Sequence, residues 1–176
     1  FVKNEILPNI LQIDKSHEFP YGIIGKAWEL GILNLSIPKE IKGFEMDAVS
    51  TALIIKELSY GDTGISTSAM CNDLANTVIA QHGNARQQEE YLGPYVKAPL
   101  LASFCLTEPG AGSDNSSMST FIAKRADGKY VLNGAKCFIT NASYASQFTV
   151  FCKVGKPTAQ FLACCIVPAE EMFRDG

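Results

Sequence analysis

The segment from residue 104 to residue 114, FCLTEPGAGSD, has the composition of a loop that meets an anionic ligand. It begins as an apolar stretch and then turns, because Pro109 fixes φ and Gly110 permits a positive φ. Gly112 carries no side chain where a phosphate would approach the backbone, and Ser113 adds a hydroxyl donor. An ordinary turn between two strands has the same composition, so this loop alone identifies no ligand.

Two common phosphate-binding loops do not fit this segment. A P-loop places a Lys and then a Ser or Thr after its second glycine, whereas Ser113 and Asp114 follow Gly112 here. A dinucleotide-binding loop needs a third glycine and a helix, but Asn115 occupies the glycine position and the strand-like residues 120–123 follow soon after. We therefore expect a β-rich domain to hold any ligand of this loop.

A second segment, residues 133–142, has complementary features. Asn133 and Gly134 form a turn signal, and the following AKCFITNA predicts a short apolar strand ending in Thr140 and Asn141. Together, LTEPGAGSD at 106–114 and LNGAKCFITN at 132–141 resemble the two flavin-contacting signatures of the acyl-CoA dehydrogenase family, in the same order and spacing. Because two independent motifs agree, chance is a weak explanation.

The resemblance covers essentially the whole chain. Landmarks similar to those of the family's amino-terminal helical domain occur at residues 19–20, 27–31, 37–40, 57–61 and 82–84. Within the family, the sequence is most similar to the medium-chain enzymes, through AWELG and LSYGDTG. The segment FCL also occurs in branched-chain members. The resemblance therefore indicates the class of enzyme and leaves the length of the acyl chain open.

This resemblance implies α,β-dehydrogenation of an acyl-CoA thioester, in which a carboxylate removes the Cα proton and N5 of FAD accepts a hydride from Cβ. It also implies an electron-transfer flavoprotein as acceptor, a homotetramer, and a location in the mitochondrial matrix or, in a bacterium, the cytoplasm. Two alternatives stay open. One is an acyl-CoA oxidase, which reoxidises its flavin with oxygen, and the other is a flavin-free interaction module of the same fold.

Residue by residue, the resemblance assigns one group of side chains to the flavin. Phe104, Leu106 and Thr107 would lie along the ring system, with Thr107 donating to the pyrimidine edge. A second group would cover another face of the flavin, with its last member near N5: Phe138, Ile139 and Thr140. Phe104 replaces a Tyr and Phe138 a Trp of close relatives, so stacking is kept while a hydrogen bond is lost.

The resemblance also implies contacts to the pyrophosphate and to the substrate. Gly112 and Ser113 would approach the pyrophosphate, and Ser113 would also contact the CoA portion of the substrate. Met70 lies in a segment that passes near the end of the acyl chain, although a Met packed in a helix core fits equally. Glu108 is interpreted as a turn residue, because in the family the catalytic glutamate belongs to a carboxy-terminal domain. We therefore expect no catalytic residue in this chain.

Composition excludes several other classes of protein. The formal net charge of −3 gives no electrostatic attraction to nucleic acid or to an anionic membrane surface. No apolar run reaches the roughly 18 to 20 residues that a membrane span needs. The six cysteines include no C-x-x-C pair, which argues against a metal site and favours free thiols in a reducing compartment. Adjacent Cys164 and Cys165 would face opposite sides of an extended strand.

The periodicity changes near residue 98 and predicts an α+β fold with two domains. Residues 1–98 have helical spacing, with Asp47 as a candidate cap, and residues 99–176 have strand spacing between turn signals. We expect an all-helical domain followed by an antiparallel, β-barrel-like middle domain. The resemblance implies that this β domain is incomplete and that the chain is truncated before a carboxy-terminal helical bundle.

Overall fold

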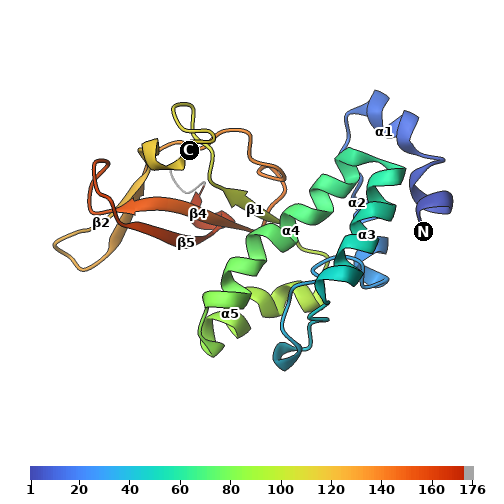
Figure 1. Cartoon of the computed structure of the whole chain (residues 1–176), viewed down its shortest axis with the longest axis horizontal. Coiled ribbons are helices and arrows are strands. Elements are labelled where there is room, and N and C mark those ends of the chain that lie inside the picture. Colours follow the sequence, from blue (N-terminus) through green and yellow to red (C-terminus); the bar gives the residue numbers. More distant parts are fainter. Residues whose placement is uncertain (173–176) are drawn as a thin grey trace. The chain divides into compact units, whose positions relative to one another are not determined.

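The computed structural model describes residues 1–172 and consists of two compact units (Figure 1). The first unit, Phe1–Leu101, is helical, and the second begins at Ala102 and contains the sheet. The order of a helical part followed by a β part, predicted from the change of periodicity, is therefore confirmed. Within residues 1–172, no helix combines the length and the apolar character that a membrane span requires.

The helical unit begins with a π-helical turn and continues through five α-helices and one 3₁₀ turn. These are η1 (Val2–Ile6), α1 (Ile10–Ser16), α2 (Tyr21–Glu29), η2 (Lys39–Ile41), α3 (Ala48–Gly61), α4 (Thr63–His82) and α5 (Ala85–Lys97). The predicted cap is present, because the Asp47 carboxylate accepts hydrogen bonds from the N–H groups of Val49 and Ser50. Asn84 and Gln87 form a reciprocal capping box at the start of α5.

The interior of the helical unit combines an apolar core with a buried amide network. Ile6, Leu33 and Leu58 belong to the apolar core. Beside it, the fully buried Asn72 amide donates to Asn34 Oδ1 at 3.1 Å and to the Leu100 carbonyl at 2.8 Å. These hydrogen bonds from the Asn72 side chain hold the last residues of the unit, which form no helix or strand that would satisfy their backbone groups.

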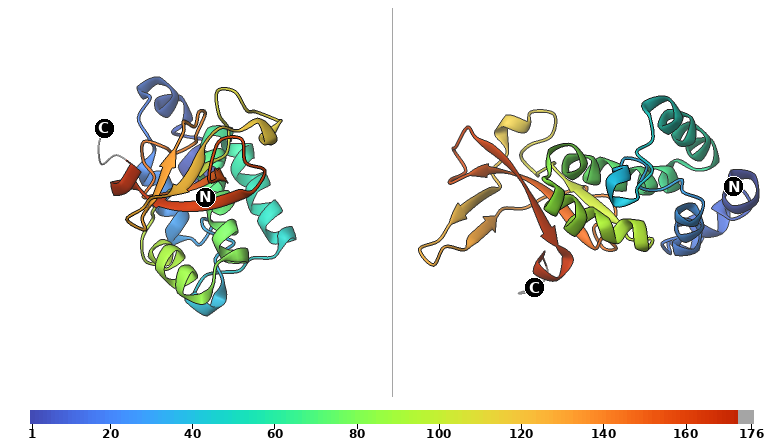
Figure 2. Two further views of the ribbon diagram at one scale, coloured as in Figure 1. Left: turned by 90° about the vertical axis from the view of Figure 1, so that its left-hand side faces the viewer. Right: turned by 90° about the horizontal axis from the view of Figure 1, so that it is seen from below.

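The second unit is a five-stranded sheet in which β4 is the central strand. The strands are β1 (Ala102–Cys105), β2 (Phe121–Lys124), β3 (Tyr130–Asn133), β4 (Gln147–Val154) and β5 (Leu162–Pro168), with the short helix α6 (Ala169–Met172) after them. β5 pairs antiparallel along nearly all of β4, and the long β4–β5 pair can be followed in Figure 2. On the other edge of β4, β1 pairs with its first half and β2 with its end, both in parallel. The sheet is therefore mixed and, within the described residues, does not close into a barrel.

The strand predicted over residues 135–142 is wrong. This segment is a loop, because Phe138 and Asn141 adopt left-handed conformations with φ of 57° and 63°, which no strand accommodates. Gly134 begins the loop with φ of 150° and packs against Thr120 so closely that an added Cβ would lie 2.2 Å from the Thr120 hydroxyl oxygen. An apolar sequence resembles a strand, but these backbone conformations and contacts fold it as a connector.

Candidate functional site

A buried ion pair joins the two segments that the sequence singled out. The Lys136 ammonium lies 2.8 Å from Glu108 Oε1 and also donates to the Leu106 carbonyl at 2.8 Å. Only 10% of the Lys136 side chain and 2% of the Glu108 side chain are exposed. A single side chain of the second segment thus bonds to two residues of the first.

The Glu108 carboxylate is held by further hydrogen bonds from the two residues that immediately precede β2. Oε2 accepts from the Ser119 N–H at 2.6 Å and from the Ser119 hydroxyl at 2.8 Å, and Oε1 accepts from the Thr120 N–H at 3.0 Å. Burial by itself raises the pKa of Glu108, but the hydrogen bonds from Lys136, Thr120 and Ser119 outweigh it and lower that pKa well below its usual range. This carboxylate is consequently a weak base that fastens the loop.

Two more hydrogen bonds bring the segments side by side. The Cys137 N–H donates to the Thr107 carbonyl at 3.0 Å, and the Ser103 hydroxyl donates to the Thr140 carbonyl at 2.8 Å. Within residues 1–172, neither the N–H nor the hydroxyl of Thr107 has a hydrogen-bond partner. Half-buried Thr107 therefore offers two donors to a ligand beside the second segment.

The turn after Thr107 is closed at its base and open at its tip. Glu108 and Ala111 exchange two backbone hydrogen bonds of 2.9 and 3.1 Å, which hold the base. The exposed Gly112 and Ser113 at the tip have N–H groups without partners among the described residues, and a Cβ added to Gly112 would meet nothing within 4 Å. The predicted space for an anion beside Gly112 is therefore present in the geometry.

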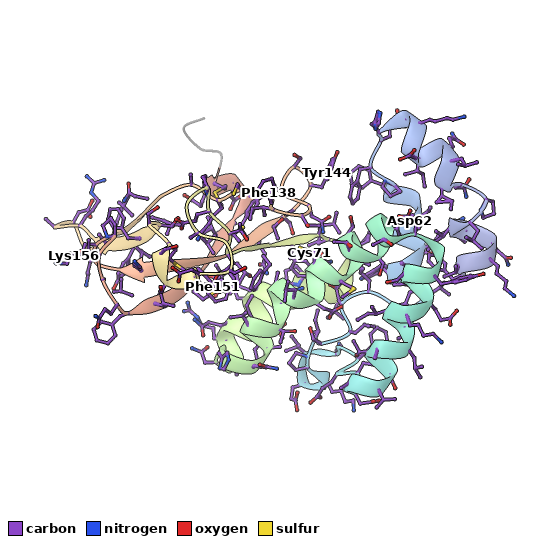
Figure 3. All side chains as sticks on the ribbon, turned by 45° about the horizontal axis from the view of Figure 1, so that its top comes forward. Asp62, Cys71, Phe138, Tyr144, Phe151 and Lys156 are labelled. Atoms are coloured by element: carbon purple, nitrogen blue, oxygen red, sulfur yellow. The ribbon has the colours of Figure 1, made fainter. Side chains whose placement is uncertain are left out.

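The side chains of the second segment face two environments. Phe138, labelled in Figure 3, is 93% exposed, and its left-handed backbone is an uncommon conformation for an aromatic residue. The adjacent Ile139 packs against the apolar cluster of the sheet, which includes Phe148 and Val150. The loop thus uses Ile139 as an anchor and leaves the Phe138 ring open to a ligand.

A cavity of about 260 Å³ lies within the sheet unit. It is lined by Cys105, Thr120, Leu132, Gly134, Lys136, Ile139, Ala142, Phe148, Val150 and Met172. Of the predicted site residues, Ile139 contributes to this lining, whereas Thr107 and Thr140 do not. The cavity is the apolar interior beneath the two segments, and it is distinct from the loop donors described above.

Phe104, Leu106 and Met70 are the remaining predicted site residues. Phe104 is half-buried in β1 and packs its ring against Phe151, with 5.0 Å between the ring centroids. Leu106 is half-buried and offers its carbonyl to Lys136. Met70 belongs to α4 of the helical unit, is 38% exposed, and accepts a hydrogen bond from the Ser66 hydroxyl on its sulfur at 3.7 Å.

Sequence reasoning missed the importance of Lys136 and Ser119. Lys136 is part of the second motif, but the sequence assigns it no contact, and Ser119 belongs to neither motif. A signal for Lys136 was present, because a lone Lys between apolar residues is costly to bury unless a carboxylate pairs with it. No comparable signal marked Ser119, whose contact with Glu108 depends on the turn at residues 115–117.

Comparison with known proteins identifies the family of both parts of the chain. Residues 1–98 match the family model described as acyl-CoA dehydrogenase, N-terminal domain, and residues 103–174 match the middle domain of the same family. The chain is 39% identical over 153 residues to a Caenorhabditis briggsae protein named "Probable medium-chain specific acyl-CoA dehydrogenase 2, mitochondrial", with 87% of this chain and 37% of the relative covered. It is 35% identical to the mitochondrial short-chain specific acyl-CoA dehydrogenase of Rattus norvegicus, with 86% and 37% covered.

A solved structure shares the fold. It is an acyl-CoA dehydrogenase from Bacillus anthracis, complexed with FAD, to which this chain is similar with a TM-score of 0.85 and 33% sequence identity. The similarity covers 95% of this chain and 29% of that chain. The chain thus spans less than half the length of the relatives it matches.

Replacing Lys136 with Met should destabilise the protein strongly, because it leaves the buried Glu108 carboxylate without its cation. We expect a loss of about 3 to 5 kcal/mol in the free energy of unfolding, measured by urea denaturation. The control is Lys129→Met, which removes an exposed ammonium and should change stability by less than about 0.5 kcal/mol. Equal stabilities of the two variants would contradict the role given to the ion pair.

The lowered pKa of Glu108 makes a second prediction, on acid stability. Because the pKa of Glu108 in the folded protein lies below its ordinary value, Glu108 stabilises the fold at pH values above that ordinary value, and this contribution is lost as the pH falls through the folded pKa. Glu108→Gln should therefore flatten the acid side of the curve of unfolding free energy against pH. Glu89→Gln, which changes an exposed carboxylate on α5, should leave the shape of the curve unchanged.

Proposed function

Because this chain belongs to the acyl-CoA dehydrogenase family, we propose that the full-length protein oxidises acyl-CoA thioesters at the bond between Cα and Cβ, with FAD as its cofactor. The observation that carries this proposal is the Lys136–Glu108 ion pair, which holds the two signature segments against each other. This ion pair thereby presents donors of the first segment that have no partner in the described part of the chain beside an exposed aromatic ring of the second segment.

The residues of this arrangement fit a flavin. An isoalloxazine ring has apolar faces and a polar pyrimidine edge. The sheet unit offers the exposed Phe138 ring together with the N–H and hydroxyl of Thr107, which have no hydrogen-bond partner among residues 1–172. The exposed N–H groups of Gly112 and Ser113 suit a pyrophosphate. The chemistry that FAD supplies when bound is the acceptance of a hydride from Cβ of the thioester.

Under this proposal, the residues of the chain position and bind. Thr107 donates to the pyrimidine edge, and Phe104 and Leu106 lie along the ring system. Phe138, Ile139 and Thr140 form the cover of a second face, with Thr140 near the hydride-accepting nitrogen. Gly112 and Ser113 receive the pyrophosphate, and Ser113 also contacts the CoA portion of the substrate.

We place the catalytic base outside this chain. The two carboxylates of the first segment are already used, since Glu108 is bound by Lys136 and Ser119, and Asp114 accepts hydrogen bonds from Ser116. The hydrogen bonds from the Ser116 hydroxyl and N–H lower the pKa of Asp114, which further weakens it as a base. A separate segment of the full-length protein would bring the proton acceptor to Cα.

The wider setting follows from the same family membership. We propose an electron-transfer flavoprotein as the electron acceptor and a homotetrameric assembly. A mitochondrial matrix location fits a eukaryotic source, in keeping with the names of the worm and rat relatives, and a cytoplasmic location fits a bacterial one.

The full-length protein should purify with visible flavin absorbance that bleaches when an acyl-CoA is added without oxygen. Thr107→Val should weaken flavin retention by about five- to tenfold, because it removes one hydroxyl hydrogen bond worth about 1 kcal/mol. This retention is measured by dialysing the protein against successively larger volumes of buffer and recording the flavin absorbance that stays with the protein. Thr158→Val, at an exposed turn, is the matched control and should retain flavin like the unaltered protein.

Three other results would each change the proposal. A protein without flavin absorbance would contradict it and favour a flavin-free module. Stoichiometric peroxide release during turnover in air would identify an oxidase. Equal flavin retention by the Thr107→Val and Thr158→Val proteins would keep the enzyme class and remove the role assigned to Thr107.

Met70 gives a prediction on substrate length. If its side chain limits the end of the acyl chain, Met70→Ala should raise kcat/KM for longer acyl-CoA substrates relative to shorter ones, since it removes volume while keeping good helix propensity. The ratio of kcat/KM across a series of acyl-CoA lengths measures the effect. Gln81→Ala, an exposed position on α4, should leave the ratio unchanged, and an unchanged ratio in the Met70 variant would place Met70 in packing alone.

A further inference from the structure

Two cysteines on neighbouring strands bring their sulfur atoms close together. Cys152 lies on β4 and Cys165 on β5, and their Sγ atoms are 3.6 Å apart. In the register of the strands, Cys165 is opposite Val150 and Cys152 is opposite Ala163, so the two thiols form a diagonal pair on one face. The pair is held by backbone pairing on both sides and does not depend on a mobile loop.

The two thiols differ in their access to solvent. Cys152 is fully buried, and its Sγ also lies 3.8 Å from the carbonyl oxygen of Ala163. Cys165 is half-buried and is therefore the more exposed residue of the pair. The adjacent Cys164 is opposite Phe151 in the register and points to the other face of the sheet.

The electrostatics assign different roles to the members of the pair. The contact with the Cys152 thiol lowers the pKa of Cys165, whereas the contact with Cys165 together with burial raises the pKa of Cys152. By contrast, burial and the neighbouring Cys165 raise the pKa of Cys164 to about 11. Of the three thiols, Cys165 is the one whose pKa is lowered and is also more exposed than Cys152, which makes it the better candidate for the reactive thiolate.

A metal site is a poorer interpretation of the same atoms. Structural zinc and iron–sulfur sites need about four ligands. Within the described residues, no group of three or more His, Cys, Asp or Glu side chains is placed to hold a metal ion. The geometry instead provides a half-buried cysteine next to a fully buried one, which fits an attacking thiol and a resolving thiol.

We propose that Cys152 and Cys165 form a redox modification site, at which a hydroperoxide converts the two thiols into a disulfide between β4 and β5. This site lies outside the residues assigned to the flavin and the substrate. Its chemistry needs no bound cofactor and is independent of the proposed dehydrogenase function.

The atoms and electrons of this conversion balance with hydrogen peroxide as the oxidant. The Cys165 thiolate attacks one peroxide oxygen, the O–O bond breaks, and the departing hydroxide takes a proton to become water. The sulfenic acid left on Cys165 is then attacked by the Cys152 sulfur, which forms the S–S bond and releases a second water. Both thiols lose one electron each, and peroxide is reduced by two electrons.

Formation of the new bond requires the two strands to shift, because diagonal neighbours in a sheet have Cα atoms about 7–8 Å apart and disulfides usually join Cα atoms about 4.4–6.8 Å apart. An S–S bond measures about 2.05 Å, so the sulfur atoms must move closer than their present 3.6 Å. Ala163, opposite Cys152, has a side chain too small to obstruct the movement.

The test treats the full-length protein with a small excess of hydrogen peroxide, blocks free thiols with an alkylating reagent, and maps the peptides by mass spectrometry. We expect the peptides containing Cys152 and Cys165 to appear joined, and a thiol reductant to separate them. A peroxide-treated protein in which both cysteines are still alkylated, or in which Cys165 pairs with a different cysteine, would overturn the proposal.

Two variants separate the roles of the thiols. Cys152→Ser should leave a sulfenic acid on Cys165 that a dimedone-type reagent traps, because the resolving thiol is absent. Cys164→Ser removes the neighbouring thiol on the opposite face and should form the Cys152–Cys165 link as fast as the unaltered protein. If the Cys164 variant lost the link while the Cys152 variant kept its peroxide-dependent disulfide, the assignment of the pair would be wrong. Should either variant fail to fold, the peptide map of the unaltered protein decides the question.

Discussion

The sheet unit depends on one buried interaction, the ion pair between Glu108 and Lys136. Burying two opposite charges costs several kcal/mol of hydration for each ion, and such a pair persists when further hydrogen bonds satisfy its remaining atoms. Here the carboxylate also accepts from Ser119 and Thr120, and the ammonium also donates to the Leu106 carbonyl. The pair therefore fixes the first segment, the second segment and the start of β2 relative to one another.

The ion pair explains how the proposed site can expose its binding groups to a ligand while the loops that carry them are held in place. The loop tips carry exposed groups, including the Phe138 ring and the N–H groups of Gly112 and Ser113, while their bases are held by buried contacts. Ile139 and the Glu108–Ala111 turn supply those contacts at each base. A ligand then meets donors already arranged for it, and little conformational entropy is lost on binding.

The thiol pair of β4 and β5 shares its surroundings with the ion pair. The Lys136 ammonium acts weakly against the rise in the pKa of Cys152, so the charge that fastens the loops also reaches the thiols. β4 connects these features, because it pairs with β1 and β2 on one edge and with β5 on the other. A disulfide between Cys152 and Cys165 would therefore modify β4, the central strand of the sheet that supports the loops.

The sequence by itself determined the helical and β halves, the cap at Asp47, most strand positions and the two signature segments, because periodicity and turn residues act over short distances. It also identified the family. Tertiary structure alone decided that residues 135–142 form a loop, that β1 and β2 run parallel to β4, and that Lys136 and Ser119 converge on Glu108. These outcomes depend on contacts between residues far apart in the chain, such as Thr120 against Gly134, and local propensity carries no information about them.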